Sequence, residues 1–368
     1  SGNKSGGFGG GIYSGEVSYL NIKHSTISDN IAASHGGGIY NSDYHSGLSV
    51  ANTVISNNIT TEYGGGIYIG GGTATLDQVT IKGNAADQGG GISNGTSMQL
   101  SNTLISGNYA TTRGGGIENN GWNMDFTLTN TSIAGNNAPT GGAVYSIVTN
   151  TSIRNCIIYG NSTGIDDVYP LSNPVISYSL IQGLAADATN HNLEGTLNPL
   201  FTNAPAASTA PFSLGDYTLQ INSPVVNKGS NSFYALGQTP DLSDITTDLA
   251  GNTRINGTVD LGAYEFEPTA VTVNEIVYVS QTGAGTKDGS SWNNATNDLQ
   301  QAIQKSTAKV YVAAGTYKPV YPANTDFSSN YVMDPGNRSN AFLLKKDVKV
   351  YGGFNATTPE AGPNLRDT

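Results

Sequence analysis

The first half of the chain alternates short apolar stretches with glycine and asparagine at a regular period. Gly-Gly-Gly-Ile occurs at residues 9–12, 36–39, 64–67, 89–92 and 114–117, and Gly-Gly-Ala-Val occurs at 141–144. The closing Ile or Val residues are 27, 28, 25, 25 and 27 positions apart. A period of this length is typical of a solenoid whose coils stack on one another.

A second element, Ile-x-x-Asn, runs in phase with the glycine clusters. Its asparagines are Asn30, Asn58, Asn84, Asn108, Asn136 and Asn161. Three residues before each isoleucine the chain has a further set, mostly amides: His24, Asn52, Gln78, Asn102, Asn130, Asn155 and Tyr178. Asparagine tolerates the left-handed backbone that a sharp corner needs. We expect the amides of both sets to form ladders that bond each coil to its neighbours.

Between these elements, apolar and polar residues alternate over short segments. Alternation with a period of two indicates strands with one buried face, and the apolar residues are mostly Ile, Val and Leu, which favour strands. The glycine clusters mark corners or a flat side where neighbouring backbones come too close for a Cβ atom. The sequence therefore predicts an all-β protein, a parallel β-helix with about 25–28 residues per coil.

The repeats weaken after Asn161, and the composition changes again near residue 276. We expect regular coils over residues 1–165, irregular closing coils over 166–265, a linker at 266–275 and a further unit over 276–368. Within that unit, Asp298 precedes apolar residues at helical spacing, which predicts one short capping helix near 297–305.

Composition narrows the classes of function. The 16 basic residues are scattered and the net charge is −11, which argues against nucleic acid as a partner. The single cysteine, Cys156, has no partner for an internal disulfide, and we expect it to be a small packed residue. No stretch approaches the roughly 18 apolar residues of a membrane-spanning helix. The scarcity of charge, at 12%, together with abundant Gly, Thr, Ser and Asn, is typical of exported bacterial surface proteins.

The paired elements resemble the repeats of polymorphic outer-membrane proteins and adhesin-type β-helices, with Ile where those families have Phe. The whole chain resembles secreted right-handed parallel β-helix repeat proteins, and this resemblance implies the right hand. Residues 278–354 are similar to the amino-terminal cap and first coils of that class, and residues 248–265 are similar to its carboxy-terminal close. The opening segment of the class therefore stands last in this chain.

This order leaves three arrangements open. The chain is a segment of a tandem array of β-helix domains, a permuted single domain whose two ends meet, or a subunit that assembles head to tail. In the third arrangement, residues 276–368 dock on the open coil at residues 1–40 of the next copy and build a filament. We expect an extracellular or cell-surface structural or adhesive protein whose partner is a second copy of itself.

Acidic residues that could support catalysis are not in register. Cleavage of a glycosidic bond uses two carboxyl groups about 5–10 Å apart, whereas Asp29, Glu62, Asp77 and Glu118 occupy different points of the repeat. We expect no enzymatic activity. The alternative is a carbohydrate-active β-helix, a polysaccharide lyase or hydrolase, with its cleft in the irregular stretch 183–212.

Other acids follow the regular coils. They are Asp166, Asp167, Asp187, Glu194, Asp241, Asp244 and Asp248. The run Asp241, Asp244 and Asp248 offers oxygen ligands for a calcium ion. Such acids are more often turn residues and caps, so we expect no cofactor and keep calcium as the alternative.

Three tyrosines stand at one position of the repeat. Tyr13, Tyr40 and Tyr68 each follow a Gly-Gly-Gly-Ile element. Facing outward, their rings would bind surface glycans or a partner protein. We favour inward or corner packing instead, because Ser93, Glu118 and Ser146 interrupt the pattern in later coils.

Overall fold

The structure is a computed structural model, and it divides the chain into two compact units. The first unit comprises Ser1–Leu219 and Asn227–Glu265, and the second comprises Gln220–Val226 and Phe266–Thr368. The described residues are 1–15, 19–42, 47–121, 124–147, 150–167, 174–266, 274–325, 327 and 333–355. The first unit ends at Glu265 and the second continues from Phe266, while Gln220–Val226 groups with the second unit, which the sequence did not indicate.

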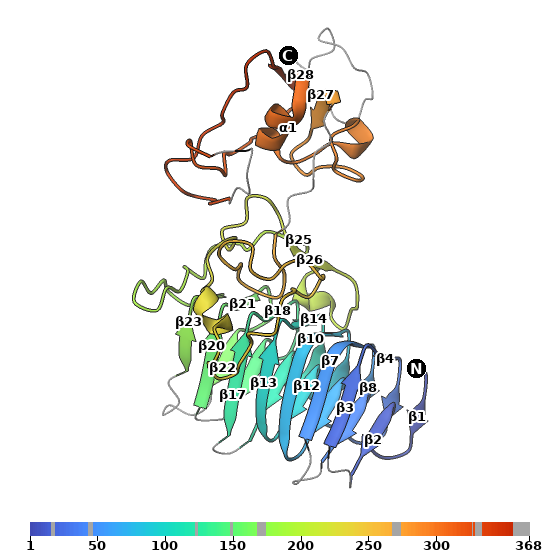
Figure 1. Ribbon diagram of the computed structural model, residues 1–368. Helices are drawn as coiled ribbons and strands as arrows, with labels where there is room; N and C mark the ends of the chain where they lie inside the picture. Colours follow the sequence, from blue (N-terminus) through green and yellow to red (C-terminus); the bar gives the residue numbers. More distant parts are fainter. Residues whose placement is uncertain are drawn as a thin grey trace. The chain divides into compact units, whose positions relative to one another are not determined.

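The first unit is a stack of parallel strands in three sheets (Figure 1). Sheet A contains β1 (Lys4–Ser5), β5 (Ile31–Ala32), β8 (Ile59–Thr60), β11 (Ala85–Gln88) and β15 (Tyr109–Arg113). Sheet B contains β2 (Ile12–Ser14), β6 (Ile39–Asn41), β9 (Ile67–Ile69), β12 (Ile92–Asn94), β16 (Ile117–Asn119), β19 (Val144–Ser146) and β22 (Ile165–Asp167). Sheet C contains β3 (Tyr19–Lys23), β4 (Thr26–Ser28), β7 (Gly47–Ser56), β10 (Thr73–Lys82), β13 (Ser97–Ser101), β14 (Leu104–Ser106), β17 (Asp125–Thr129), β18 (Ser132–Ala134), β20 (Asn150–Arg154), β21 (Ile157–Tyr159), β23 (Val175–Ser177) and β24 (Leu180–Ile181).

The repeats stack in the register that the sequence predicts. In sheet B the isoleucine after each glycine cluster pairs with its counterpart in the next coil, as Ile39 does with Ile67. In sheet C the isoleucine of each Ile-x-x-Asn element does the same, as Ile55 does with Ile81. These side chains fill one continuous core along the solenoid. Hydrophobic burial therefore sets the register, because a shift by one residue would expose every isoleucine. The predicted parallel β-helix is confirmed.

Each coil bends sharply within sheet C. The seven residues at the bend, His24, Asn52, Gln78, Asn102, Asn130, Asn155 and Tyr178, have φ between 44° and 52°. This left-handed backbone separates β3 from β4, β13 from β14 and the later pairs, and it bends the longer strands β7 and β10 at Asn52 and Gln78. The corner predicted from the amide-rich position is therefore present.

The coils extend past residue 165 through β23 and β24, which stack on β20 and β21. Irregular chain follows, and its short elements are β25 (Phe201–Asn203), η1 (Ala207–Thr209), β26 (Asp216–Leu219) and η2 (Asn231–Tyr234). β25 and β26 form an antiparallel pair. Residues 227–265, called the closing segment below, complete this unit.

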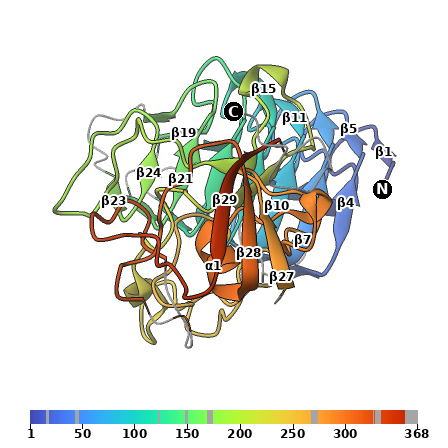
Figure 2. The ribbon, with the colours of Figure 1, turned by 90° about the horizontal axis from the view of Figure 1, so that it is seen from above.

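The second unit has a small parallel sheet, in the order β27-β28-β29, with one helix beside it (Figure 2). Its elements are β27 (Asn274–Val279), η3 (Trp292–Asn294), α1 (Leu299–Lys305), β28 (Ser306–Ala313) and β29 (Lys349–Phe354). Asp298 caps α1, since its carboxylate accepts a hydrogen bond from Gln301 N at 2.9 Å. The predicted helix is confirmed, while β27 begins inside the stretch predicted as a linker.

Candidate functional site

The asparagines of Ile-x-x-Asn form a continuous column inside the solenoid. From Asn3 through Asn30, Asn58, Asn84, Asn108, Asn136 and Asn161, each Nδ2 donates to Oδ1 of the next asparagine at 2.9–3.0 Å. The backbone N–H of each residue donates to the same Oδ1 atom. The amides from Asn58 onward also donate to an isoleucine carbonyl of the preceding coil, as Asn108 does to Ile81 O at 3.0 Å. The column thus satisfies buried backbone groups at a turn.

The corner amides do not form the ladder that we expected for Asn52, Gln78, Asn102, Asn130 and Asn155. In the described residues one bond joins neighbouring coils, from Asn155 Nδ2 to Asn130 Oδ1 at 3.0 Å. The Asn52 side chain is exposed. The other amides bond to the closing segment, which covers this corner of sheet C.

The closing segment reaches the corner amides through one tyrosine and several backbone carbonyls. Tyr234 OH donates to Asn102 Oδ1 at 3.1 Å and to Asn130 Oδ1 at 2.9 Å. Gln78 Nε2 donates to Thr247 O at 3.0 Å and to Asp248 O at 2.9 Å. The left-handed corner turns these side chains toward a segment distant in sequence, so their role is to hold the closing segment in place.

The predicted calcium ligands are not brought together. Among the described residues, no three His, Cys, Asp or Glu side chains lie close enough to hold a metal ion. Asp248 is buried, and its carboxylate accepts from Asn252 N and Glu265 N, both at 2.7 Å. Asp241 is exposed and accepts from Ser243 N at 3.0 Å, and Asp244 is also exposed. Asp248 instead organises the closing segment.

Tyr13, Tyr40 and Tyr68 face solvent on sheet B, contrary to the inward or corner packing that we favoured. The isoleucine before each tyrosine points into the core, so the tyrosine points outward. Their rings stack in sequence, with centroids 5.2 Å apart for Tyr13 and Tyr40 and 5.3 Å apart for Tyr40 and Tyr68. Tyr13 is 61% exposed.

A second aromatic column lies beside the first. It contains Phe8, His35 and Tyr63, which immediately precede the first glycine of each cluster. The first glycine has φ of 63–70° in these coils and turns the chain back, so that the residues on either side of the cluster approach one another. Phe8 stacks on Tyr40 with centroids 4.7 Å apart, and His35 makes an edge contact with Tyr68, also at 4.7 Å.

The two columns together form the aromatic strip, which comprises Phe8, Tyr13, His35, Tyr40, Tyr63 and Tyr68. Sequence reasoning found one column and missed the other. The signal was available, since an aromatic residue precedes the glycine cluster in the first three repeats and Gln88 and Arg113 take its place in the next two. The strip therefore ends where polar residues replace the rings in both columns.

Beyond the strip, the same face carries a buried polar cluster. Glu118 pairs with Tyr145 in the register of sheet B, so Tyr145 and not Ser146 continues the tyrosine position. The Glu118 side chain is 0% exposed. It accepts from Ser93 Oγ at 2.7 Å and pairs with Arg113 Nη2 at 3.2 Å. Burial raises the pKa of the Glu118 carboxyl, while the Ser93 hydrogen bond and the Arg113 charge oppose this shift.

We expect acidification to stabilise the protein, in part through Glu118. A carboxyl whose pKa is raised by folding binds its proton more tightly in the folded state. Its contribution to stability is full below the unfolded pKa and is lost as the pH rises through the folded pKa. Thermal unfolding should therefore occur at a higher temperature at pH 5 than at pH 8.

The variant Glu118→Gln should reduce this difference, because the amide keeps the shape of the side chain without titrating. Glu194→Gln, which alters an exposed carboxylate, serves as the control and should keep the wild-type pH dependence. An unchanged pH dependence in Glu118→Gln would contradict the assignment.

The irregular stretch predicted to hold a cleft borders a cavity of about 270 Å³. Side chains of Asp, Glu, His, Lys or Arg do not contribute to its described lining. The nearby carboxylates accept hydrogen bonds from backbone groups close to them in sequence. Asp187 Oδ1 accepts from Thr189 N at 2.8 Å, and Glu194 Oε2 accepts from Ala186 N at 3.2 Å. The side chains of Asp166 and Asp167 lie outside the described residues. The described lining of the cavity thus does not include the pair of carboxyl groups that glycoside cleavage uses.

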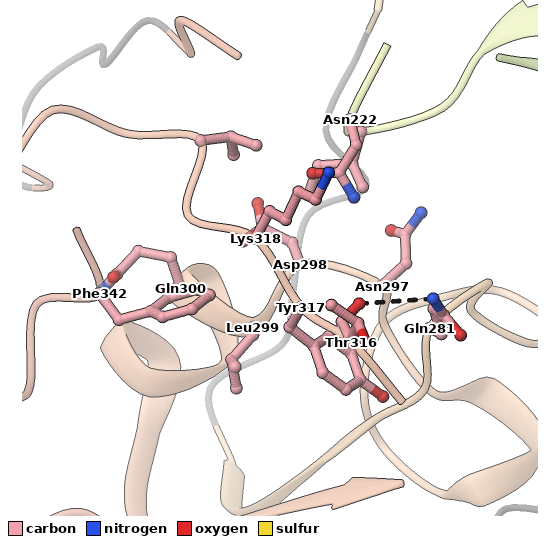
Figure 3. Close-up of a pocket in the computed structure, with 12 residues that line it drawn as sticks. Asn222, Gln281, Asn297, Asp298, Leu299, Gln300, Thr316, Tyr317, Lys318 and Phe342 are labelled. Carbon is pink, nitrogen blue, oxygen red and sulfur yellow. Dashed lines mark hydrogen bonds between the residues drawn. The ribbon is translucent and has the colours of Figure 1, made fainter. Parts of the chain in front are cut away.

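The second unit contains a smaller hollow beside the start of α1 (Figure 3). Its volume is about 20 Å³, enough for about one water molecule. Gln281, Thr316 and Tyr317 line it together with Asp298. The Asp298 carboxylate caps α1 and accepts from Tyr321 OH at 2.6 Å. These contacts give Asp298 a structural role.

Comparison with known proteins identifies the solenoid. Residues 10–181 match the family model described as the right handed beta helix region. This match agrees with the parallel stack of sheets A, B and C and supports its right hand. No curated protein and no solved structure gave a significant match. In the described part of the chain, none of the helices has the length and apolar character needed to cross a membrane.

Proposed function

We propose that this right-handed parallel β-helix is a non-enzymatic, extracellular adhesive protein that binds glycans through the aromatic strip. The observation that carries the proposal is the stack of aromatic rings on the outer face of a regular solenoid. Phe8 and Tyr13 are 42% and 61% exposed, and the other four residues of the strip are half-buried. Aromatic residues gathered on a solvated face typically mark an interaction surface.

The chemistry of the strip suits sugars. Sugar rings present apolar C–H faces bordered by hydroxyl groups, and tyrosine pairs an apolar ring with a polar hydroxyl group. The Asn column and sheet B fix the positions of the rings before a ligand arrives, which lowers the entropic cost of binding. The imidazole of His35 is held in place at the edge of the strip, since its Nδ1 lies 2.7 Å from Ser34 Oγ and 3.0 Å from Glu62 Oε2.

An array of immobilised glycans tests the proposal. We expect the wild-type protein to bind a subset of extended neutral glycans, and the double variant Tyr13→Ala, Tyr40→Ala to lose at least tenfold in affinity, equivalent to about 1.4 kcal/mol. Tyr19→Ala is the matched control, because Tyr19 is 58% exposed on sheet C, away from the strip. Equal binding by the wild-type protein and the double variant would contradict the proposal.

Head-to-tail association of residues 276–368 with residues 1–40 stays a prediction. In the described residues, β1, β2 and β3 each pair with a strand on one side, and an unpaired strand edge accepts further strands. Light scattering over a range of concentrations, with electron micrographs of the same samples, distinguishes rods from monomers.

A further inference from the structure

We infer that the cavity of about 270 Å³ in the first unit is a second binding site, which accepts one neutral sugar ring. This site is separate from the aromatic strip, and the inference does not depend on the proposed function. Its floor consists of turns in two successive coils, at Ala134–Gly135 and Tyr159–Gly160. Its wall is the loop 198–206.

The loop after Gly183 leaves this space open for a structural reason. In an earlier coil of the same column of turns, Phe212 packs directly against Gly107, and its backbone N–H donates to Gly107 O at 2.9 Å. A Cβ atom on Gly135 would lie 2.8 Å from the Phe212 ring. At Gly160 a Cβ atom would meet nothing within 4 Å. The loop thus covers the turn at Gly107, covers the turn at Gly135 in part and leaves the turn at Gly160 uncovered.

The wall of the cavity is anchored, so the site is formed before a ligand arrives. β25 pairs with β26, and Phe201 makes an edge contact with Tyr217 at 5.3 Å between ring centroids. Thr202 Oγ1 and Thr218 Oγ1 lie 3.0 Å apart. A preformed wall reduces the ordering cost of binding.

The lining selects the class of ligand. Tyr159 and Phe201 contribute aromatic rings, and Pro205 contributes an apolar surface. Asn198 Oδ1 accepts from Leu200 N at 2.8 Å, which fixes the carboxamide while its Nδ2 can still donate to a ligand. A charged ligand would find no opposite charge in this lining, so a neutral ligand with apolar faces and hydroxyl groups fits best.

The volume limits the size of the ligand. The cavity has a volume of about 270 Å³. This is close to the lower limit of small-molecule sites, about 300 Å³. One sugar ring fits this space, whereas a peptide segment or a lipid chain needs a longer groove.

Saturation-transfer NMR with a panel of neutral methyl glycosides, followed by titration of those that bind, tests the inference. We expect at least one glycoside to bind with a dissociation constant near the millimolar range. Ala204→Trp, at an exposed position that lines the cavity, should weaken binding at least tenfold. Ser208→Trp adds the same side chain to an exposed position of η1, outside the lining, and should bind as the wild type does.

Folding and location need their own controls. Ala206→Trp provides a second filling variant if Ala204→Trp fails to fold as judged by circular dichroism. The double variant Tyr13→Ala, Tyr40→Ala should keep the binding, which separates this site from the strip. Binding that survives both filling variants, or a panel in which no glycoside binds, would overturn the inference.

Discussion

Gly90→Ala is expected to destabilise the solenoid more than any other conservative change considered for this chain. Gly90 is the middle glycine of its cluster, and its φ lies outside the left-handed region, so the penalty is steric. A Cβ atom there would lie 2.6 Å from Gly115 O and would also overlap Tyr109 O. Both obstacles are backbone atoms of the neighbouring coil, which cannot move without disturbing the stack. We expect a loss of more than about 3 kcal/mol in the free energy of unfolding.

Gly164→Ala is the matched control for this experiment. The nearest atom to a Cβ at Gly164 is Gln182 O at 3.8 Å, an ordinary contact. The preceding coil already carries Ala143 at the equivalent position, since both residues come directly before paired residues of sheet B, Val144 and Ile165. Chemical denaturation followed by circular dichroism should show Gly164→Ala within about 0.5 kcal/mol of the wild type. Similar midpoints for both variants would contradict the account of the glycine cluster.

Asn108→Ala is expected to cost about 3–5 kcal/mol. The change removes the acceptor of Asn84 N, at 2.9 Å, and the amide that donates to Ile81 O, at 3.0 Å. Both bonds are buried, and each unsatisfied buried group costs about 1–3 kcal/mol. The missing side-chain volume adds a cavity term. The denaturation midpoint is the measurement.

Asn21→Ala is the control for the asparagine column. Asn21 lies on β3 and is exposed, so its replacement should change stability by less than about 0.5 kcal/mol. If Asn108→Ala proves as mild as Asn21→Ala, the bonds of the column contribute little to the stability of the stack.

The sequence was most informative where each repeat makes the same contact. Ile55 and Ile81 occupy equivalent positions because burial and backbone pairing act identically in every coil. The same holds for Asn84 and Asn108, whose amides meet across one coil spacing. Local periodicity was therefore sufficient to predict the strands, the corners and the inner column.

Contacts between segments distant in sequence could not be predicted in this way. Nothing in the repeat indicates that Asn102 and Asn130 would meet Tyr234 of the closing segment. The buried pair of Arg254 Nη2 and Glu265 Oε1, 2.7 Å apart, likewise depends on how that segment folds back. Burial raises the pKa of Glu265 while the Arg254 charge opposes the shift, a balance that depends on the tertiary structure.

The aromatic strip could be predicted from the sequence only in part. Its first column follows from the repeat, and its second column needs the turn at the glycine cluster, which places residues before and after the cluster side by side. Their exposure depends on the direction of each side chain. Our preference for inward packing was wrong because it relied on the later coils, where Ser93 and Glu118 serve a separate polar cluster.

Mapping the bound glycan by NMR tests the central claim most directly. The protein would be labelled at the aromatic rings of tyrosine and phenylalanine and titrated with the tightest-binding glycan from the array. The account predicts that the largest chemical-shift changes occur at Phe8, Tyr13, Tyr40, Tyr63 and Tyr68. Unchanged resonances for these five rings at saturation, with changes confined to other aromatic residues, would contradict it.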